Sequence, residues 1–477
     1  MAYCGYITNL KDVRVHPNAD KLMLATCFGN TVCVSKDKYF EGQLGVYFPT
    51  DGQLSLEFCS QNGLLAVYEN GVNVSGGYMD PEKRNVKAIK LRGEKSDGLF
   101  LPVECLAYTG VDINEFKPGD QITVLNGKEI CRKYIPKRAA ARSARGVSSK
   151  KKKVKVNIAP TFYEHKDTAQ LAYNLGEFKC GDLIQISRKI HGTSQRTGYH
   201  KVFQGYKDTF AMKVKNAIKK LFSKDFEEVH GPAIYDWDYI SGTRRTVLDN
   251  FDGGFYGSNE FREPHAKVFE GKLWKGETVY YEVAGFTHTG TPIMATCSNK
   301  KLNDKEFVKK YGEETVFSYG CSPTGEKMVY GKDEEGAFSI PLKVPQSRVF
   351  VYRMTMTNED GQEIEYTPDF MALRCEYMGV ETVPVEWTGF IPENPASATD
   401  STITAGEWVL NKAEQYYDGE EPLDPTHIRE GCVVRILNRP GFSAYKHKNF
   451  SFKVLEGIIK ESALEPDMEE ADGLDDT

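Results

Sequence analysis

The sequence predicts an α+β protein in which a small N-terminal β-barrel precedes a larger domain of antiparallel sheets with flanking helices. Short apolar segments separated by turn residues occupy residues 1–128, and further strand-like runs recur after residue 157. A helical pattern spans residues 207–224. Because the chain has 477 residues, of which 40% are hydrophobic, it can bury a sizeable core and is expected to form more than one domain.

Residues 1–128 carry the strand and turn pattern of a small barrel. Strands are predicted at Leu44–Phe48 and Gly98–Pro102. Within this region, His16–Leu22 and Leu91–Gly98 resemble segments of the OB-fold modules that bind tRNA in synthetase-associated proteins. The resemblance implies an OB-type, RNA-binding-like module. Two roles remain open for Asn18 and Asp20, which either contact RNA or only shape a loop.

Positive charge is concentrated in residues 129–156, which include Arg142, Arg145 and the run Lys150–Lys153. This segment has few large apolar residues and cannot bury enough surface to order itself. We predict a basic linker that is either solvated or lies along phosphates. The overall net charge of −6 hides this block, because residues 463–477 form an acidic tail that we predict to be disordered.

Residues 157–462 form the second predicted domain. Its strand candidates are Leu183–Ile186, Val279–Val283, Val349–Tyr352 and Cys432–Ile436. The helical stripe between residues 207 and 224 is expected to pack into the core. The lysines beside that stripe predict a basic outer face, for which contact with RNA is the alternative to solvation.

The sequence contains no cysteine or histidine motif typical of a metal site and no export signal. The eleven cysteines include no Cys-x-x-Cys pair and no metal-type His/Cys spacing. No signal peptide leads the chain, and no apolar run reaches the length of about 18 residues that a membrane span requires. These absences predict reduced thiols in a cytoplasmic or otherwise intracellular protein.

Five short motifs of the larger domain follow one another in a fixed order. They are Lys189–Gly192, Gly242–Arg245, Tyr281–Gly285, Glu430–Val434 and Lys446–Lys448. Each motif alone is weak, since a lysine beside a glycine is most often a surface turn residue. Together they indicate a site at which a lysine attacks a nucleotide phosphate.

A lysine nucleophile has to lose its proton before it can react. At a reference pKa near 10.4, only about one amine in a thousand is neutral at pH 7.4. Neighbouring cations lower the pKa of a lysine because they disfavour its ammonium form. Lys446 and Lys448 are two residues apart, so on a strand they share a face. There they can bind an α-phosphate and lower the pKa of Lys189; an ordinary exposed strand edge is the alternative.

The other motifs offer groups for the rest of a nucleotide. Glu430 can hold a hydrated Mg²⁺, with Mn²⁺ as the alternative. Glu282 can accept the proton of a ribose hydroxyl. Two forked donors for phosphate or ribose and two rings that share one strand face complete the set: Arg244, Arg245, Phe350 and Tyr352. For each residue, a core aromatic or a surface ion pair is the alternative.

This ordered set resembles the covalent nucleotidyltransferase superfamily of polynucleotide ligases and mRNA capping enzymes, in which a lysine of motif I forms a nucleotide phosphoramide. The resemblance covers about residues 162–456 and implies an ATP-grasp-like nucleotidyltransferase domain. It implies Lys189 for motif I, Arg244 or else Arg245 for motif Ia, Glu282 for motif III, Tyr352 or Phe350 for motif IIIa, Glu430 for motif IV, and Lys446 with Lys448 for motif V.

Two departures refine the resemblance. Most members carry aspartate at the third position of motif I, whereas this chain has His191, followed by Gly192-Thr193 as in some RNA ligases. Phosphate contact and a core position are both open for His191. In DNA ligases and capping enzymes an OB domain follows motif V, whereas here the OB-like module comes first. That order, with Thr291–Met294 and Val351–Thr355, looks like the fifth family of RNA ligases.

The resemblance implies an ATP-dependent RNA ligase that uses Mg²⁺ or Mn²⁺ and works in RNA repair. It would join 3′-OH and 5′-phosphate ends through lysyl-AMP and an adenylylated 5′ end. We expect a monomer that acts on RNA ends or on a nicked duplex with an RNA 3′-OH, and not on a membrane. The region 299–346 and the helix near Lys213 look like insertions. The alternatives are a DNA ligase or GTP-using guanylyltransferase of the same superfamily, and a non-catalytic RNA-binding protein.

Overall fold

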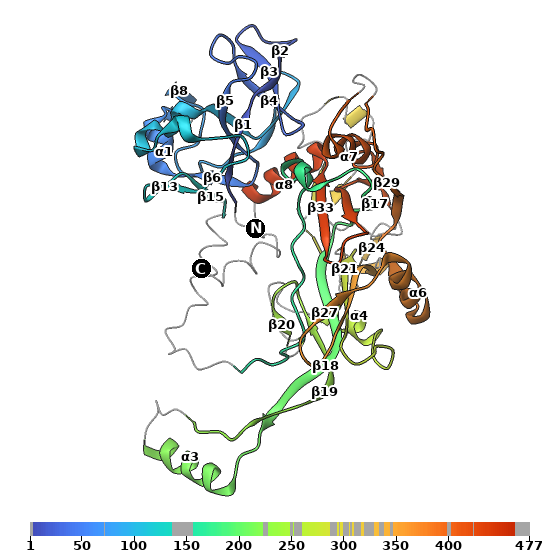
Figure 1. Ribbon diagram of the computed structural model, residues 1–477. Helices are drawn as coiled ribbons and strands as arrows, with labels where there is room; N and C mark the ends of the chain where they lie inside the picture. The colour runs from blue at the N-terminus through green and yellow to red at the C-terminus, as the bar shows by residue number, and fades with distance from the viewer. Residues whose placement is uncertain are drawn as a thin grey trace.

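The computed structural model describes residues 3–70, 72–135, 156–222, 228–248, 251, 260–286, 293–294, 296–298, 305, 308–309, 316–318, 329–332, 338–343, 347–397, 402–422 and 424–462. It confirms the α+β class, with an N-terminal OB-type barrel beside a larger domain (Figure 1). The predicted linker from residue 136 to 155, Thr291-Pro292, most of the region 299–346 and the acidic tail lie outside the described residues.

The N-terminal barrel is built from short antiparallel strands around two clusters of buried apolar side chains. Its main sheet has the order β11-β5-β1-β12, and β2-β3-β4 forms a meander beside it. The predicted strands at 44–48 and 98–102 are confirmed as β5 and β11. The strands are β1 (Gly5–Asn9), β2 (Lys11–Val15), β3 (Leu22–Cys27), β4 (Asn30–Ser35), β5 (Leu44–Phe48), β6 (Gly52–Leu54), β7 (Ala66–Glu69), β8 (Val72–Gly76), β9 (Ala88–Leu91), β10 (Glu94–Asp97), β11 (Leu99–Pro102), β12 (Gln121–Ile122), β13 (Val124–Leu125), β14 (Lys128–Glu129) and β15 (Cys131–Lys133). The helical segments are α1 (Leu56–Gln61), η1 (Val103–Thr109) and η2 (Ile113–Glu115).

The two barrel segments that resembled RNA-binding modules bond to each other. His16 is 2% exposed, and its Nε2 donates to the carbonyl of Leu91 at 3.0 Å. The side-chain amide of Asn18 donates to the carbonyl of Arg92, also at 3.0 Å. These contacts give His16 and Asn18 a structural role in joining the two segments, whereas Asp20 is exposed. Contact of this region with RNA stays a prediction.

Two mainly antiparallel sheets organise the larger domain; β16–β33 and β26–β28 are parallel pairs within them. One has the order β16-β33-β32-β17-β29, and the other has the order β20-β19-β18-β21-β26-β27, with β28 paired to β26. All four predicted strands lie in these sheets. The strands are β16 (Ala169–Gln170), β17 (Leu183–Arg188), β18 (Thr193–Tyr206), β19 (Ala233–Gly242), β20 (Val247–Leu248), β21 (Glu277–Ala284), β26 (Arg348–Thr357), β27 (Glu363–Glu365), β28 (Glu381–Thr382), β29 (Val385–Phe390), β32 (Gly431–Ile436) and β33 (Ser443–Lys448).

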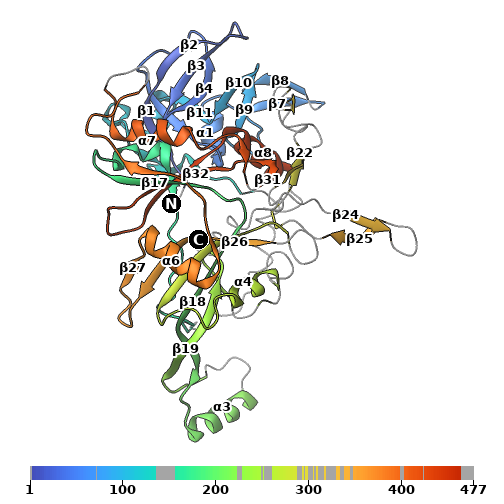
Figure 2. The same cartoon turned by 90° about the vertical axis from the view of Figure 1, so that its right-hand side faces the viewer.

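Helices and small hairpins surround these sheets (Figure 2). Capping side chains begin two of the helices: Thr367 accepts from Phe370 N before α6, and Thr404 and Glu407 form a capping box on α7. The helical segments are η3 (Leu171–Tyr173), η4 (Leu175–Glu177), η5 (Glu260–Arg262), α4 (Glu263–Lys267), α6 (Pro368–Met378), α7 (Ala405–Glu414) and α8 (Phe450–Ser462). The small hairpins pair β22 (Thr296–Ser298) with β23 (Val316–Ser318), β24 (Val329–Lys332) with β25 (Phe338–Lys343), and β30 (Glu420–Glu421) with β31 (Asp424–Ile428).

The helix predicted near residues 207–224 is present as α3 (Phe210–Phe222), but its described apolar side chains do not pack into the core. It lies at the far end of the long β18–β19 hairpin, beyond the rest of the sheet (Figure 1). Phe210, Val214 and Ile218 are 83%, 40% and 50% exposed. The prediction of core packing was therefore wrong. Helical spacing indicates that a segment can form an amphipathic helix, but the path of the chain decides what covers its apolar face.

The barrel contacts the larger domain through α8 and η3. The ring of Tyr173 stacks on Tyr6 of the barrel, with 4.7 Å between centroids. On α8, Lys453 Nζ lies 2.6 Å from Asp97 Oδ2 of β10. None of the described helices is long and apolar enough to cross a membrane.

Candidate active site

A cleft between the two sheets holds about 1120 Å³ of open space. Its floor includes Ser187 of β17 and Val433 of β32, and its opposite wall includes Glu282 of β21 and Tyr352 of β26. Lys189 lies at the cleft, directly after β17. Its lining combines apolar side chains with a few charged and hydroxyl groups, as is usual for small-ligand sites in proteins.

Lys189 lines the cleft, and Glu430, directly before β32, and Lys448, at the end of β33, lie beside it. The backbone amide of Lys189 donates to the carbonyl of Gly431 at 3.1 Å, which brings the end of β17 beside Glu430. Lys189 Nζ then lies 2.8 Å from Glu430 Oε1. In the β32–β33 pair, Lys448 stands opposite Gly431, and its Nζ lies 3.5 Å from the same Glu430 oxygen. The first, fourth and fifth motifs therefore converge on one carboxylate.

Glu430 is 2% exposed and carries the charge that joins this cluster. Burial alone would raise the pKa of its carboxyl, but Lys189, His191 and Lys448 outweigh burial and hold that pKa well below its usual range. No group of three His, Cys, Asp or Glu side chains placed to cage a metal occurs in the described ranges. An ionised carboxylate of this kind suits Mg²⁺ or Mn²⁺, which take one or two protein carboxylates and otherwise use phosphate and water.

His191 is buried beside Glu430. Its Nδ1 lies 3.2 Å from Glu430 Oε2, and its ring meets Phe452 edge-on, with centroids 5.0 Å apart. Burial lowers the pKa of His191 more than Glu430 raises it, so the imidazole is neutral near pH 7. His191 therefore contacts Glu430, the candidate metal-binding residue. Contact between His191 and phosphate stays a prediction.

Gly192 lets motif I approach the strand that carries Glu282. A Cβ atom at Gly192 would lie 2.4 Å from the carbonyl oxygen of Val283 on β21. Real Cβ atoms do not approach backbone so closely, because repulsion rises steeply below van der Waals contact. Glycine at this position therefore permits β18 to begin beside β21.

Arg244 and Arg245 both pair with Asp167. Arg244 Nη1 and Arg245 Nη2 each lie 3.1 Å from one of its carboxylate oxygens. Arg196 of β18 anchors the loop that carries Arg244 and Arg245. Its guanidinium donates to the carbonyls of Thr243, at 2.7 Å, and of Arg244. Arg244 lines the cleft. Arg196 and Asp167 were missed in the sequence, because nothing in their spacing distinguishes them from surface charges.

Tyr352, and not Phe350, lines the cleft. The Tyr352 hydroxyl lies 2.8 Å from Ser194 Oγ. Phe350 is fully buried in a small apolar cluster with Ile190 and Ala284. Glu282 is 9% exposed and stands opposite Phe350 in the β21–β26 pair. Tyr352 packs against the cluster that contains Phe350, but the β21–β26 pairing skips Tyr352 at a register shift, and the two aromatic residues occupy different depths.

Lys446 shares a strand face with Lys448, as their spacing predicted. It stands opposite Val433, a residue of the cleft floor, and is partly exposed. Lys446 and Lys448 were predicted to disfavour the ammonium form of Lys189, but the negative charge of Glu430 lies closer to it. Glu430 contacts Lys189 directly, and an opposite charge favours the ammonium form.

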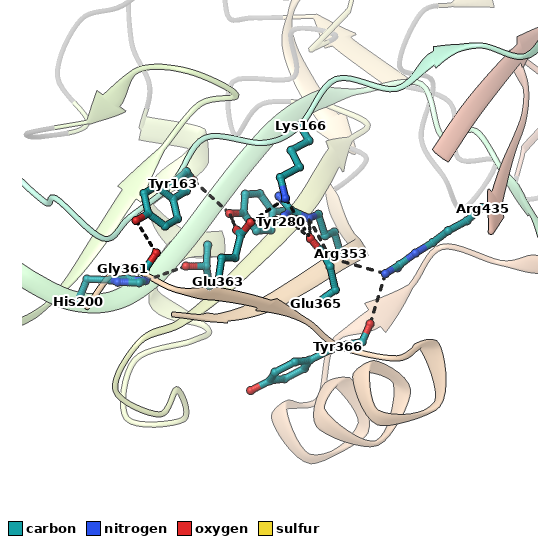
Figure 3. Close-up of polar contacts among 11 residues, drawn as sticks. Tyr163, Lys166, His200, Tyr280, Arg353, Gly361, Glu363, Glu365, Tyr366 and Arg435 are labelled. Atoms are coloured by element: carbon teal, nitrogen blue, oxygen red, sulfur yellow. Dashed lines mark hydrogen bonds and ion pairs between the residues drawn. The ribbon is translucent and has the colours of Figure 1, made fainter. Parts of the chain in front are cut away.

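A buried polar network around Arg353 includes Arg435, whose guanidinium lies 3.6 Å from Glu365 (Figure 3). Arg353 is fully buried and pairs with Glu363, at 3.0 Å, and with Glu365. Arg435, which lines the cleft, donates to the carbonyl of Tyr366 at 3.3 Å. No motif pointed to these residues, because their partners are set by contacts between strands distant in sequence.

Comparisons with known proteins indicate the same architecture. Residues 5–103 match a family described as an OB-fold domain. The fold is similar to that of a Naegleria gruberi RNA ligase mutant in its apo form, with a TM-score of 0.50 and 14% identity over 95% of this chain and 97% of that one. A mutant of the same ligase with AMP and Mn gives a TM-score of 0.50 and 14% identity over 94% and 97%. Another with ATP and Mn gives 0.50 and 13% over 94% and 98%. No curated protein sequence matches the chain. The chain thus has an RNA-ligase-like fold.

Proposed function

We propose that this protein is an ATP-dependent RNA ligase that joins 3′-OH and 5′-phosphate ends. The observation that carries the proposal is the convergence of Lys189 and Lys448 on Glu430, at 2.8 Å and 3.5 Å, beside a cleft that holds Arg244 and Tyr352. The RNA-ligase-like fold supports it, because solved relatives in fold carry ATP or AMP with Mn.

In the proposed first step, the neutral amine of Lys189 attacks the α-phosphorus of ATP. An N–P bond forms and the bond to pyrophosphate breaks, which leaves lysyl-AMP. Lys448 and Lys446 bind the phosphate charge that accumulates during this displacement. A divalent metal held by Glu430 would supply further neutralisation of phosphate charge.

The remaining site residues hold the nucleoside in this proposal. The Tyr352 ring stacks on the purine, and Glu282 accepts the proton of a ribose hydroxyl. Arg244 donates to phosphate or ribose oxygens, and its distance from Lys189 is set by the loop that Arg196 anchors. Positioning of this kind lowers the barrier because the reacting atoms are held near their attack geometry.

Two further displacements complete the proposed reaction. The AMP moves from Lys189 to a 5′-phosphate, and a 3′-OH then attacks that phosphate and releases AMP. The preferred substrate is a nick with an RNA 3′-OH, and the OB-type barrel and the basic linker supply affinity for the RNA.

The test is incubation of the purified protein with α-labelled ATP and Mg²⁺, followed by a denaturing gel. A labelled band that pyrophosphate discharges and that Lys189→Ala abolishes is expected. Lys201→Ala, which removes an exposed pair with Glu359 and a contact with the Trp237 ring, is the control and should keep the band. An adduct that survives Lys189→Ala would overturn the proposal.

Substrate arms of the same assay separate the alternatives. Labelled GTP in place of ATP tests a guanylyltransferase, and sealing of all-DNA nicks in preference to nicks with an RNA 3′-OH would indicate a DNA ligase. A protein that shifts RNA on a gel but forms no adduct would be a non-catalytic RNA-binding protein.

A further inference from the structure

Helix α8 begins next to the cluster formed by Lys189, Glu430 and Lys448. Asn449 precedes it, and its backbone amide donates to the carbonyl of Glu430 at 2.8 Å. The side chain of Asn449 accepts from the amide of Ser451, also at 2.8 Å, and so caps the first turn of α8. The position of the helix is therefore tied to the backbone of Glu430.

Two side chains one turn apart on α8 reach two residues of the site. Phe452 packs edge-on against His191, with 5.0 Å between ring centroids. Glu456 accepts from Lys448 Nζ at 3.1 Å and 3.0 Å through its two carboxylate oxygens. Residues four apart lie on one helix face, so a single face of α8 supports both contacts.

The pair between Glu456 and Lys448 is withdrawn from solvent. The side chain of Glu456 is 7% exposed and that of Lys448 is 15% exposed. Charges so placed are screened less than surface pairs, and removing one partner leaves the other poorly compensated. The contact therefore constrains the Lys448 side chain more firmly than an exposed ion pair would.

We propose that Glu456 is a positioning residue that holds Lys448 for the α-phosphate, and that the N-terminal barrel keeps Glu456 in place through α8. The inference rests on the function proposed above. Lys448 contacts both Glu430 and Glu456. Glu430 is also the candidate metal ligand, so in this proposal Glu456 is the carboxylate that remains paired with Lys448 when Glu430 binds the metal. A lysine that is already fixed loses fewer rotamers when it meets phosphate.

The barrel reaches α8 through a second buried ion pair. Lys453 Nζ lies 2.6 Å from Asp97 Oδ2, with side chains 14% and 7% exposed. Lys95 of the barrel also lies over the ring of Phe450, the first residue of α8, at 5.4 Å. Asp97 belongs to a segment that the sequence associated with RNA-binding modules, but its carboxylate faces α8.

The test measures single-turnover formation of lysyl-AMP across a range of ATP concentrations. Glu456→Gln keeps the shape of the side chain and removes its charge. It is expected to lower the maximal rate by roughly tenfold to a hundredfold, with little change in the ATP concentration that gives half the rate. In a Lys448→Met background, the same substitution should add no further loss, because Glu456 acts through Lys448.

Glu57→Gln is the matched control, because Glu57 pairs with Lys128 at 2.8 Å within the barrel, and it should leave the rate unchanged. Melting temperatures of all variants separate loss of folding from loss of rate. If Glu456→Gln does not fold, Glu456→Asp keeps the charge and withdraws it by one methylene, and a reduced rate is again expected. Asp97→Asn tests the barrel contact and should lower the rate less than Glu456→Gln does.

A normal rate in a folded Glu456→Gln or Glu456→Asp variant would overturn the positioning role, as would a further loss of rate in the Lys448→Met background. A normal rate in Asp97→Asn would overturn the part played by the barrel. A wild-type protein that forms no lysyl-AMP would instead refute the proposed function, so the two failures are distinguishable.

Discussion

Glu430 Oε1 lies 2.8 Å from the Nζ of Lys189, so the candidate nucleophile is held in an ion pair by the candidate metal ligand. An opposite charge favours the ammonium form, whereas attack on phosphorus needs the neutral amine. In the proposed reaction, Glu430 would exchange Lys189 for another cation before the amine reacts. One carboxylate would restrain the nucleophile and then serve the phosphates.

Substitution of Glu430 by glutamine tests that double role. Glutamine removes the negative charge that pairs with Lys189 and that would hold the metal beside the phosphates. We therefore expect lysyl-AMP formation to fall by about a hundredfold or more. The measurement is the initial rate of adduct formation over a series of Mg²⁺ concentrations, at which the variant should remain slow throughout. Glu359→Gln, at an exposed pair, should behave as wild type. Full activity of Glu430→Gln would contradict the assignment.

Tyr352 and Phe350 differ in depth, which predicts different effects of their removal. Tyr352→Ala removes a ring from the cleft wall, so we expect the half-saturating ATP concentration to rise by about tenfold, since stacking on a base is worth roughly 1–3 kcal/mol. Tyr352→Phe keeps the ring and should stay close to wild type. Phe350→Ala should chiefly lower the melting temperature, because Phe350 is fully buried. Unchanged ATP dependence in Tyr352→Ala would exclude stacking.

His200 predicts a loss of stability in acid. It is fully buried between the hydroxyls of Thr161, at 3.0 Å, and Thr278, at 2.7 Å, and burial lowers its pKa from 6.5 to about 4. Between these values the unfolded chain binds a proton that the folded chain does not. The contribution of His200 is thus present above pH 6.5 and is lost as the pH falls towards 4, by about 3 kcal/mol in total.

Urea unfolding of the wild type at several pH values should show this slope, and His200→Gln should reduce it. Other buried histidines add to the wild-type slope, since burial also lowers the pKa of His447 to about 3. An identical slope in wild type and His200→Gln would mean that His200 is not buried in its neutral form.

The exposed position of α3 predicts tolerance to substitution. Because the Phe210 side chain is 83% exposed, Phe210→Ser should change the free energy of unfolding by no more than about 0.5 kcal/mol. Phe269 is fully buried in the core of the larger domain, and Phe269→Ala should cost about 3–5 kcal/mol. Denaturant unfolding measures both. A large loss in Phe210→Ser would show that the apolar face of α3 is covered in solution.

The fold class, the strands that carry the motifs and the order of the motifs could be predicted from the sequence. Lys189, Glu430 and Lys448 entered one hypothesis because the five motifs follow the order found in the nucleotidyltransferase superfamily that the chain resembles. Alternation of side chains in β-structure likewise predicted that Lys446 and Lys448 share a face, and the β32–β33 pair bears this out.

Which of two similar residues reaches the cleft, and which partner pairs with each charge, depends on contacts between distant parts of the chain. Phe350 and Tyr352 are two residues apart, but Phe350 is fully buried opposite Glu282, whereas Tyr352 lies at a register shift of the β21–β26 pair and lines the cleft. The apolar stripe of α3 is exposed because the β18–β19 hairpin carries it beyond the core. Arg196 beneath the arginine loop and Glu456 beside Lys448 left no signal in the sequence, because long-range contacts depend on the path of the whole chain and not on local spacing.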